Sequence, residues 1–177
     1  IDWPCDLKTR FSEKNVGIIG GVSSSIDWFF ENVQSGIILE HDCLPNKSFF
    51  RFCEENLEKY KNNIEVMHIS GNFFQKKPIG DYDYYFSKIP HIWGWATWKE
   101  SWKKYNSKMN GYKEFIRNKK IKNYFGNDFY ITAWKHLFDQ IYYKKSKTWD
   151  FQWTYSIFKN KGLAITPNKN LVSNVGF

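Results

Sequence analysis

The sequence predicts an α/β domain, and three observations lead to that prediction. The chain has 177 residues, of which 42% are hydrophobic, and this is enough for one domain with a sizeable core. Apolar residues at helical spacing over residues 26–33 are followed by a short apolar run at residues 37–39, the helix-then-strand order of an α/β unit. Glu40 and Asp42 come directly after that run, where open α/β sheets bind their ligands.

The first elements are predicted from turn and cap residues. Residues 1–15 show loose alternation of apolar side chains, which favours an extended segment. Residues 15–21 form a glycine-rich loop that matches no established phosphate-binding pattern. The serines at residues 23–25 can cap a helix that ends before Gly36. A glycine-rich loop that leads into a helix N-terminus can bind anions through free backbone N–H groups.

The later elements are predicted from apolar periodicity. Ser48 is the expected cap of the next helix. The polar stretch at residues 106–126 favours a loop with a short helix, and the chain shows no linker between domains. The expected helices cover residues 48–61, 98–105, 128–143 and 148–162, and the expected strands cover residues 65–70, 82–87 and 163–166. His68 and His136 are expected to be packed or surface residues and not ligands.

Charge and cysteine content limit the classes of function. The net charge of +8 comes from basic runs at residues 99–108, 117–122 and 144–147, which suit a phosphorylated ligand, an anionic membrane or a solvated surface. No nucleic-acid motif accompanies them, so no nucleic-acid partner is expected. Three cysteines without CxxC spacing argue against a disulfide framework or zinc site and favour the cytoplasm. No apolar run is long enough to span a membrane.

Two short stretches carry candidate chemistry. Glu40 and Asp42 offer hard oxygen ligands for Mg²⁺ or Mn²⁺, which usually bridge to phosphate oxygens; a polar, solvated loop accounts for them equally well. Residues 91–98 hold three tryptophans within six residues around Gly94, which suit either a hydrophobic plug or a platform for a sugar ring. Asp150 lies near the N-terminus of the last expected helix, where an aspartate is most often a cap.

Several motifs occur together in the order of one family. They are NVG at 15–17, IDWFF at 26–30, GIILEHDCLP at 36–45, SFFRFC at 48–53, HIWGWATW at 91–98, WDFQW at 149–153 and NLVSNVGF at 170–177. In this combination the chain resembles the haemolysin-like glycosyltransferases, a bacterial family of nucleotide-diphospho-sugar transferases with a GT-A fold. A more distant resemblance is to the Golgi N-acetylglucosaminyltransferases. The resemblance runs from about Trp3 to Phe177.

The resemblance implies a single GT-A-like domain over residues 1–177. This domain would be a Rossmann-like mixed sheet flanked by helices, without the first strand-helix unit and the C-terminal tail of the family. The family's Glu-Asp-Asp motif, which binds the nucleotide ribose and a divalent metal on the diphosphate, falls on residues 40–42, with His41 in place of the middle acid. Asp42 is thereby the implied ligand of Mn²⁺ or Mg²⁺.

The resemblance also assigns the remaining site residues. Asp150 is the implied catalytic base, because a similar Trp-Asp motif carries the base in the Golgi relatives. The expected donor-binding residues are Arg10, Asn15, Gly17, Glu40 and His41. The expected acceptor- or sugar-binding residues are Trp93, Gly94, Trp95 and Trp149.

The predicted function is metal-dependent transfer of a sugar from a nucleotide-diphospho-sugar, with a UDP-sugar favoured, to a hydroxyl of a glycan or other acceptor. The expected reaction is an inverting direct displacement in the bacterial cytoplasm, and the basic surface suits peripheral association with the inner face of the membrane. The alternative is a non-catalytic carbohydrate-binding module on a degenerate GT-A scaffold, which the replacement by His41 would favour. A nucleic-acid binder would rest on net charge alone.

Overall fold

A five-stranded mixed sheet forms the centre of the protein in the computed structural model, which describes residues 3–143 and 147–176. The strands run in the order β1-β5-β3-β6-β4, and β3 and β6 are parallel whereas the other neighbours are antiparallel. They are β1 (Ser35–Ile38), β3 (Val66–Ser70), β4 (Tyr84–Ser87), β5 (Trp95–Trp98) and β6 (Leu163–Pro167). A second antiparallel sheet pairs β2 (Cys43–Pro45) with β7 (Val172–Asn174). The predicted mixed α/β class is confirmed.

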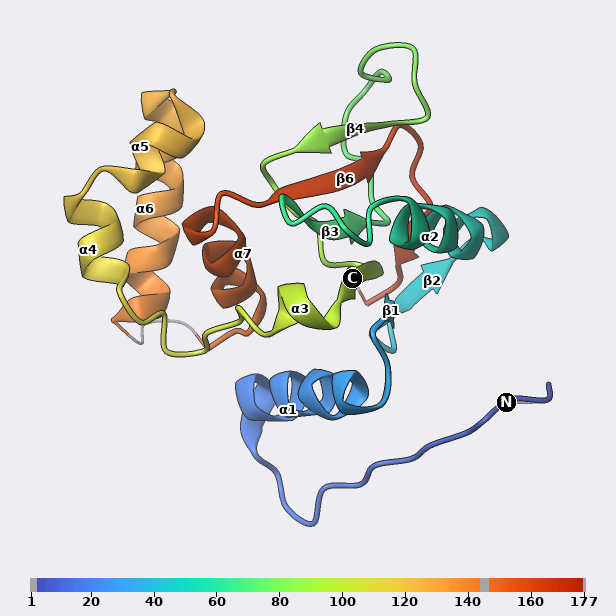
Figure 1. Cartoon of the computed structure of the whole chain (residues 1–177). Helices are drawn as coiled ribbons and strands as arrows, with labels where there is room; N and C mark the ends of the chain where they lie inside the picture. Colours follow the sequence, from blue (N-terminus) through green and yellow to red (C-terminus); the bar gives the residue numbers. More distant parts are fainter. Residues whose placement is uncertain (1–2, 144–146, 177) are drawn as a thin grey trace.

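Helices pack around the central sheet, as Figure 1 shows. They are α1 (Gly17–Asn32), α2 (Lys47–Lys59), α3 (Lys99–Trp102), α4 (Tyr112–Arg117), α5 (Lys120–Phe125), α6 (Asp128–Tyr142) and α7 (Asp150–Lys159). Helix α2 packs on β1, β3 and β5, and α7 lies between α6 and the sheet (Figure 1). None of the helices in the part of the chain that the structure describes is both long and apolar enough to span a membrane.

The core consists of two buried clusters on opposite faces of the sheet. Strand β5 separates them, because successive side chains of a strand point to opposite faces. Trp95 belongs to a large aromatic cluster with residues of α1, α3, α6 and α7. Ala96 and Trp98 belong to a smaller cluster with Phe49 and Cys53 of α2.

Helix α1 begins at Gly17, six residues before the expected start, so the prediction of a glycine-rich loop over residues 15–21 was wrong. The Asn15 side-chain oxygen accepts a hydrogen bond from the Gly17 backbone N–H at 2.8 Å and opens the helix. The Ser23 and Ser25 hydroxyls donate to carbonyl oxygens four residues earlier, at 2.6 and 2.8 Å. Serine commonly makes this bond inside a helix, and here it takes the place of the expected capping role.

Three further differences concern residues near the candidate site. Residues 95–98 form strand β5 and were not expected to be a strand, and the helix after them ends at Trp102. Asn46, and not Ser48, caps α2, with its side-chain oxygen 3.1 Å from the Phe49 backbone nitrogen. Residues 172–174 form strand β7, which was not expected.

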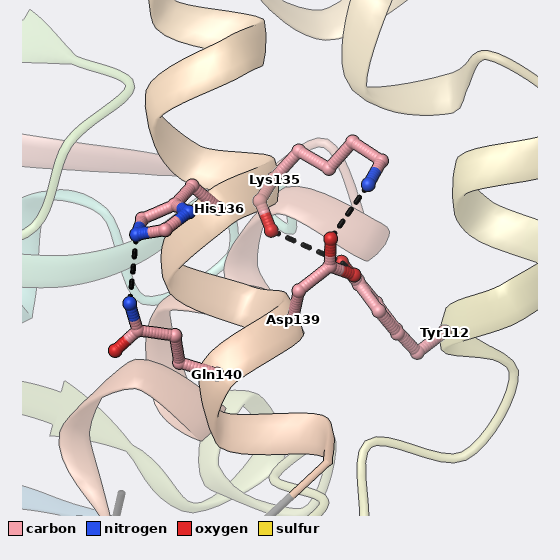
Figure 2. Close-up of polar contacts among 5 residues, drawn as sticks. All are labelled: Tyr112, Lys135, His136, Asp139 and Gln140. Carbon is pink, nitrogen blue, oxygen red and sulfur yellow. Dashed lines mark hydrogen bonds and ion pairs between the residues drawn. The ribbon is translucent and has the colours of Figure 1, made fainter. Parts of the chain in front are cut away.

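Residues 106–126 contain two short helices, α4 and α5, instead of one. Figure 2 shows the contact of α4 with α6: the Tyr112 hydroxyl of α4 donates to Asp139 Oδ1 of α6 at 2.7 Å. Within α6, Lys135 Nζ donates to Asp139 Oδ2 at 2.6 Å. Partial burial opposes ionisation of Asp139, but these two hydrogen bonds outweigh it and lower its pKa. His136 is exposed and contacts Gln140 (Figure 2), so its predicted surface position is confirmed.

The prediction that His68 is a packed residue is also confirmed. His68 is fully buried; its Nδ1 accepts from the Trp153 indole at 3.1 Å, and its Nε2 lies 2.9 Å from the His91 carbonyl oxygen. Burial lowers the pKa of His68 to about 3, so it is a neutral packing residue. Cys5, Cys43 and Cys53 are free thiols. Residues 144–146 of the last basic run and Phe177 of the NLVSNVGF motif lie outside the described residues.

Candidate functional site

The predicted carboxylates meet at the end of strand β1. Glu40 and Asp42 lie in the turn between β1 and β2, and Asp150 is the first residue of α7. Partial burial raises the pKa of Glu40, and the negative charges of Asp42 and Asp150 raise it further. Both carboxylates are therefore near enough to Glu40 to disfavour its charged form. Segments more than a hundred residues apart in the chain therefore form one acidic site.

One oxygen of Glu40 lacks a partner. Glu40 Oε1 is buried and has no hydrogen-bond partner among the described residues. The Trp149 side chain approaches the carboxyl group and lowers its pKa by hydrogen bonding, an effect smaller than those of burial and Asp42. A buried carboxylate oxygen without a partner is costly. The site is thus arranged to receive a cation or a hydrogen-bond donor.

The C-terminal segment holds Asp42 in place. The Val175 backbone N–H donates to the Asp42 carbonyl oxygen at 2.9 Å, and the Cys43 thiol donates to Asp42 Oδ1 at 3.8 Å. A Cβ atom added to Gly176 would lie 2.5 Å from Asp42 Oδ2. The absence of a side chain at Gly176 therefore leaves room for the Asp42 carboxylate.

Two residues that were not expected in the site contact Asp150 or its neighbour Trp149. The Thr148 hydroxyl donates to Asp150 Oδ1, and the positive end of the α7 dipole favours a negative charge at this position. The Tyr105 hydroxyl donates to the Trp149 carbonyl oxygen at 3.3 Å. Burial raises the pKa of Tyr105, with smaller contributions from Asp150 and Asp27, so this phenol lies beside the acidic site. Thr148 adjoins the Trp-Asp pair in the sequence, whereas nothing in the sequence singles out Tyr105.

The tryptophans expected to bind sugar are mostly part of the core. Trp95 and Trp149 are 0% and 2% exposed, and their rings stack at 5.9 Å between centroids. Trp95 also stacks on His68 at 5.0 Å, so these indoles form the floor under the site and present no open face. Trp93 is half-buried, with its ring 5.5 Å from that of Phe74. Among the four expected sugar-binding residues, Trp93 is the one that reaches the surface.

Gly94 is buried where three segments meet. Its φ of +70° falls in the left-handed region, which favours glycine. An added Cβ atom would lie 2.8 Å from Val172 and 3.1 Å from Leu39. Gly94 thus allows close packing behind the acidic turn.

The residues expected to bind the donor separate into two groups. Glu40 lies in the acidic site, and His41 is exposed in the same turn. Arg10 lies on an exposed N-terminal arm, and its guanidinium donates to the Ser24 and Ser25 hydroxyls at 3.1 and 3.2 Å. Asn15 and Gly17 open helix α1. The hydrogen bonds described for Arg10, Asn15 and Gly17 lie within α1 and the N-terminal arm. They do not join α1 to the carboxylates.

The carboxylates fit one kind of metal binding. Within residues 3–143 and 147–176, no group of three or more His, Cys, Asp or Glu side chains is arranged to hold a metal ion. Magnesium is usually bound through only one or two carboxylates together with substrate phosphates and water. Glu40, with its unpartnered oxygen, and the neighbouring Asp42 fit that mode. They do not form a cage made of protein ligands alone.

The chain was compared with models of protein families and with curated proteins. Neither comparison gave a match.

The acidic site predicts a pH-dependent stability. Because the pKa of Glu40 is raised in the folded protein, ionisation of Glu40 destabilises the fold as pH rises. Glu40→Gln removes that charge, so we expect it to raise the melting temperature of the unliganded protein by a few degrees at pH 7–8. Near pH 3 Glu40 is protonated in both folded and unfolded chains, and the expected difference vanishes. Thermal unfolding measured across pH checks this.

The matched control for that experiment is Glu13→Gln. Glu13 lies on the exposed arm, so its neutralisation changes net charge equally without affecting the site. If the melting temperatures of Glu40→Gln and Glu13→Gln depend on pH in the same way, the pKa of Glu40 is not raised in the folded protein.

Proposed function

We propose that the protein is a glycosyltransferase that moves a sugar from a nucleotide-diphospho-sugar to an acceptor hydroxyl, in the GT-A-like family that its motifs resemble. The observation that carries the proposal is the convergence of Glu40, Asp42 and Asp150 around a buried oxygen that has no partner. A nucleotide sugar brings a diphosphate and a divalent cation, and such a ligand fits two carboxylates that are not neutralised by any ion pair among the described residues.

In this mechanism Glu40 and Asp42 are the residues that would hold Mn²⁺ or Mg²⁺ together with the donor. When bound, the cation supplies Lewis-acid stabilisation of the charge that develops on the departing diphosphate. A UDP-sugar is the favoured donor. Trp93, which is half-buried, offers an apolar surface to a sugar ring.

Asp150 acts as the general base. Its carboxylate takes the proton from the acceptor hydroxyl while the acceptor oxygen forms a bond to the anomeric carbon. The bond from that carbon to the phosphate oxygen breaks, and the nucleoside diphosphate leaves with the electron pair. The Thr148 hydroxyl, which donates to Asp150 Oδ1, fixes the direction of the base. A single displacement of this kind inverts the anomeric configuration, and the acceptor is a glycan or another hydroxyl compound.

The second candidate is a carbohydrate-binding module without catalytic activity. It is favoured by the absence of a three-ligand metal group in the described residues and by the exposed His41 at the centre of the acidic turn. This module would bind glycans without metal. The enzyme is the stronger proposal, because burial of Glu40 beside two other carboxylates has no evident use in a metal-independent glycan site.

Thermal-shift measurements with nucleotide sugars test the two candidates. A ligand that binds only the folded state stabilises it by about 2.7 kcal/mol at one hundred times its Kd. We expect a nucleotide sugar to raise the melting temperature with Mn²⁺ or Mg²⁺ and to have little effect with EDTA. The nucleoside without its diphosphate serves as the control. Stabilisation by glycans alone, with no turnover of any nucleotide sugar, would instead support the binding module.

A further inference from the structure

A pocket beside the first turn of α7 is lined by residues other than those of the acidic site. It has a volume of about 730 Å³, within the range of small-molecule sites. Its walls come from α1, the segment between α3 and α4, α4, the end of α6 and the first turn of α7. None of its lining residues is one of the three carboxylates or Trp93, so the proposed transferase site does not account for it.

The charge of this pocket is one-sided. Lys108, Lys113 and Lys147 line it, and no aspartate or glutamate does. None of these three lysines takes part in the ion pairs found among the described residues. Three unpaired ammonium groups around one concave surface attract a multiply charged anion. A phosphate monoester, which carries up to two negative charges, has the matching chemistry.

The floor of the pocket carries an unsatisfied amide. Gln152 lines it and is 2% exposed, and its Oε1 is buried without a hydrogen-bond partner among the described residues. The last side-chain torsion of glutamine is soft, so either end of the amide can turn toward a ligand. A ligand hydroxyl can satisfy this group, since it both donates and accepts hydrogen bonds.

The remaining walls are apolar and aromatic. Ile141 and Tyr142 come from the end of α6, and Met109 precedes α4. Tyr143 is 58% exposed at the rim, with its ring 5.2 Å from that of Tyr142. Tyrosine rings stack well on the apolar faces of other rings. The pocket therefore combines a place for a phosphate, a place for a hydroxyl and a surface for a ring.

We propose that this pocket, lined by Lys108, Lys113, Tyr142 and Gln152, binds a sugar phosphate. The lysines hold the phosphate, Gln152 bonds a ring hydroxyl, and the tyrosines cover the apolar face of the sugar. This assignment does not depend on the transferase proposal, because it uses none of the same residues.

Binding of glucose 6-phosphate, measured by isothermal titration calorimetry at low salt, tests the assignment. We expect binding at least tenfold tighter than that of glucose or inorganic phosphate. The double variant Lys108→Gln/Lys113→Gln should weaken it at least tenfold, and Gln152→Leu should weaken it severalfold. The control Lys120→Gln/Lys122→Gln removes the same charge from the exposed face of α5 and should leave the Kd unchanged.

Several results would overturn the assignment. Equal affinity for inorganic phosphate and glucose 6-phosphate would mean a simple anion site, and tighter binding of uridine monophosphate would mean a nucleotide site. An unchanged Kd in the Lys108/Lys113 double variant would place the ligand elsewhere, and this variant changes only surface side chains, so it tests the proposal even if Gln152→Leu misfolds. Asp42→Ala should leave glucose 6-phosphate binding intact; loss of both ligands in that variant would mean one shared site.

Discussion

Asp150→Asn is expected to lower kcat by about 10²–10⁴-fold, the usual contribution of a general base, while the Kd of the nucleotide sugar changes by no more than a few-fold. Asparagine keeps the size of the side chain and an oxygen that can accept from the Thr148 hydroxyl, the partner of Asp150 Oδ1. It cannot take a proton from the acceptor. Initial rates and equilibrium donor binding, measured on the same preparation, separate these two effects.

A suitable control for this variant is Asp128→Asn. Asp128 is the first residue of α6, just as Asp150 is the first residue of α7, so the two substitutions remove the same helix-terminal charge. We expect Asp128→Asn to retain full turnover. If Asp150→Asn also retains it, Asp150 is not the base; if Asp150→Asn loses donor binding instead, the carboxylate serves to bind the donor.

Asp42→Ala is expected to abolish metal-dependent donor binding. Loss of an outer-shell partner commonly costs about 10–100-fold in metal affinity, and removal of a direct ligand should cost at least about 100-fold. The fold should tolerate the change, because Asp42 adds to the charge repulsion that raises the pKa of Glu40. Titration of the donor at several Mn²⁺ concentrations, together with thermal unfolding of the unliganded variant, measures both expectations.

The control for Asp42→Ala is Asp81→Ala, which removes an exposed acid from the loop before β4. Its donor affinity should equal that of the natural protein at every Mn²⁺ concentration. Metal-dependent binding that survives in Asp42→Ala would exclude Asp42 as the ligand, and Glu40 would then be the next residue to change.

Elements with strong apolar periodicity were predicted well from the sequence. Helix α6 spans Asp128–Tyr142 and is one residue shorter than expected. The prediction was this accurate because the apolar stripe of the helix repeats over four turns. Strand β1 was expected at residues 37–39 and is found at Ser35–Ile38. Strand β1 is half-buried along its length and lies at the edge of the sheet. A continuous apolar run is typical of a fully buried strand, so it does not indicate this edge position.

Elements that depend on tertiary contacts were not predicted. All four residues of β5 are buried, so they show no alternation of apolar and polar side chains, and three nearby tryptophans suggest a loop equally well. Gly20 and Gly21 suggest a break, yet they lie inside α1. The packing of α1 on α3, with the Trp102 indole donating to Asp27 at 2.7 Å, stabilises a helix that local propensity alone would shorten.

Some residues of the candidate site were likewise predicted from the sequence, and others were not. Carboxylates that follow a strand can be recognised from residue type and order, so Glu40 and Asp42 were expected, whereas the role of Asp150 was implied by the family resemblance alone. The roles of Tyr105 and Gly176 depend on segments that meet only in the folded chain. The burial of Trp95 and Trp149 likewise follows from the aromatic core between the sheet and α7, and a tryptophan-rich motif does not distinguish a covered ring from an exposed one.

The small β2–β7 sheet has a consequence for how the protein folds. It pairs Cys43 with Asn174 and Pro45 with Val172, so residues 46–171 lie between its two strands. Contacts between residues so distant in sequence close a long loop and tend to form late. Asp42 is held by Val175 just beyond this sheet. The acidic turn therefore reaches its final geometry only after residues 172–175 have been synthesised and have docked.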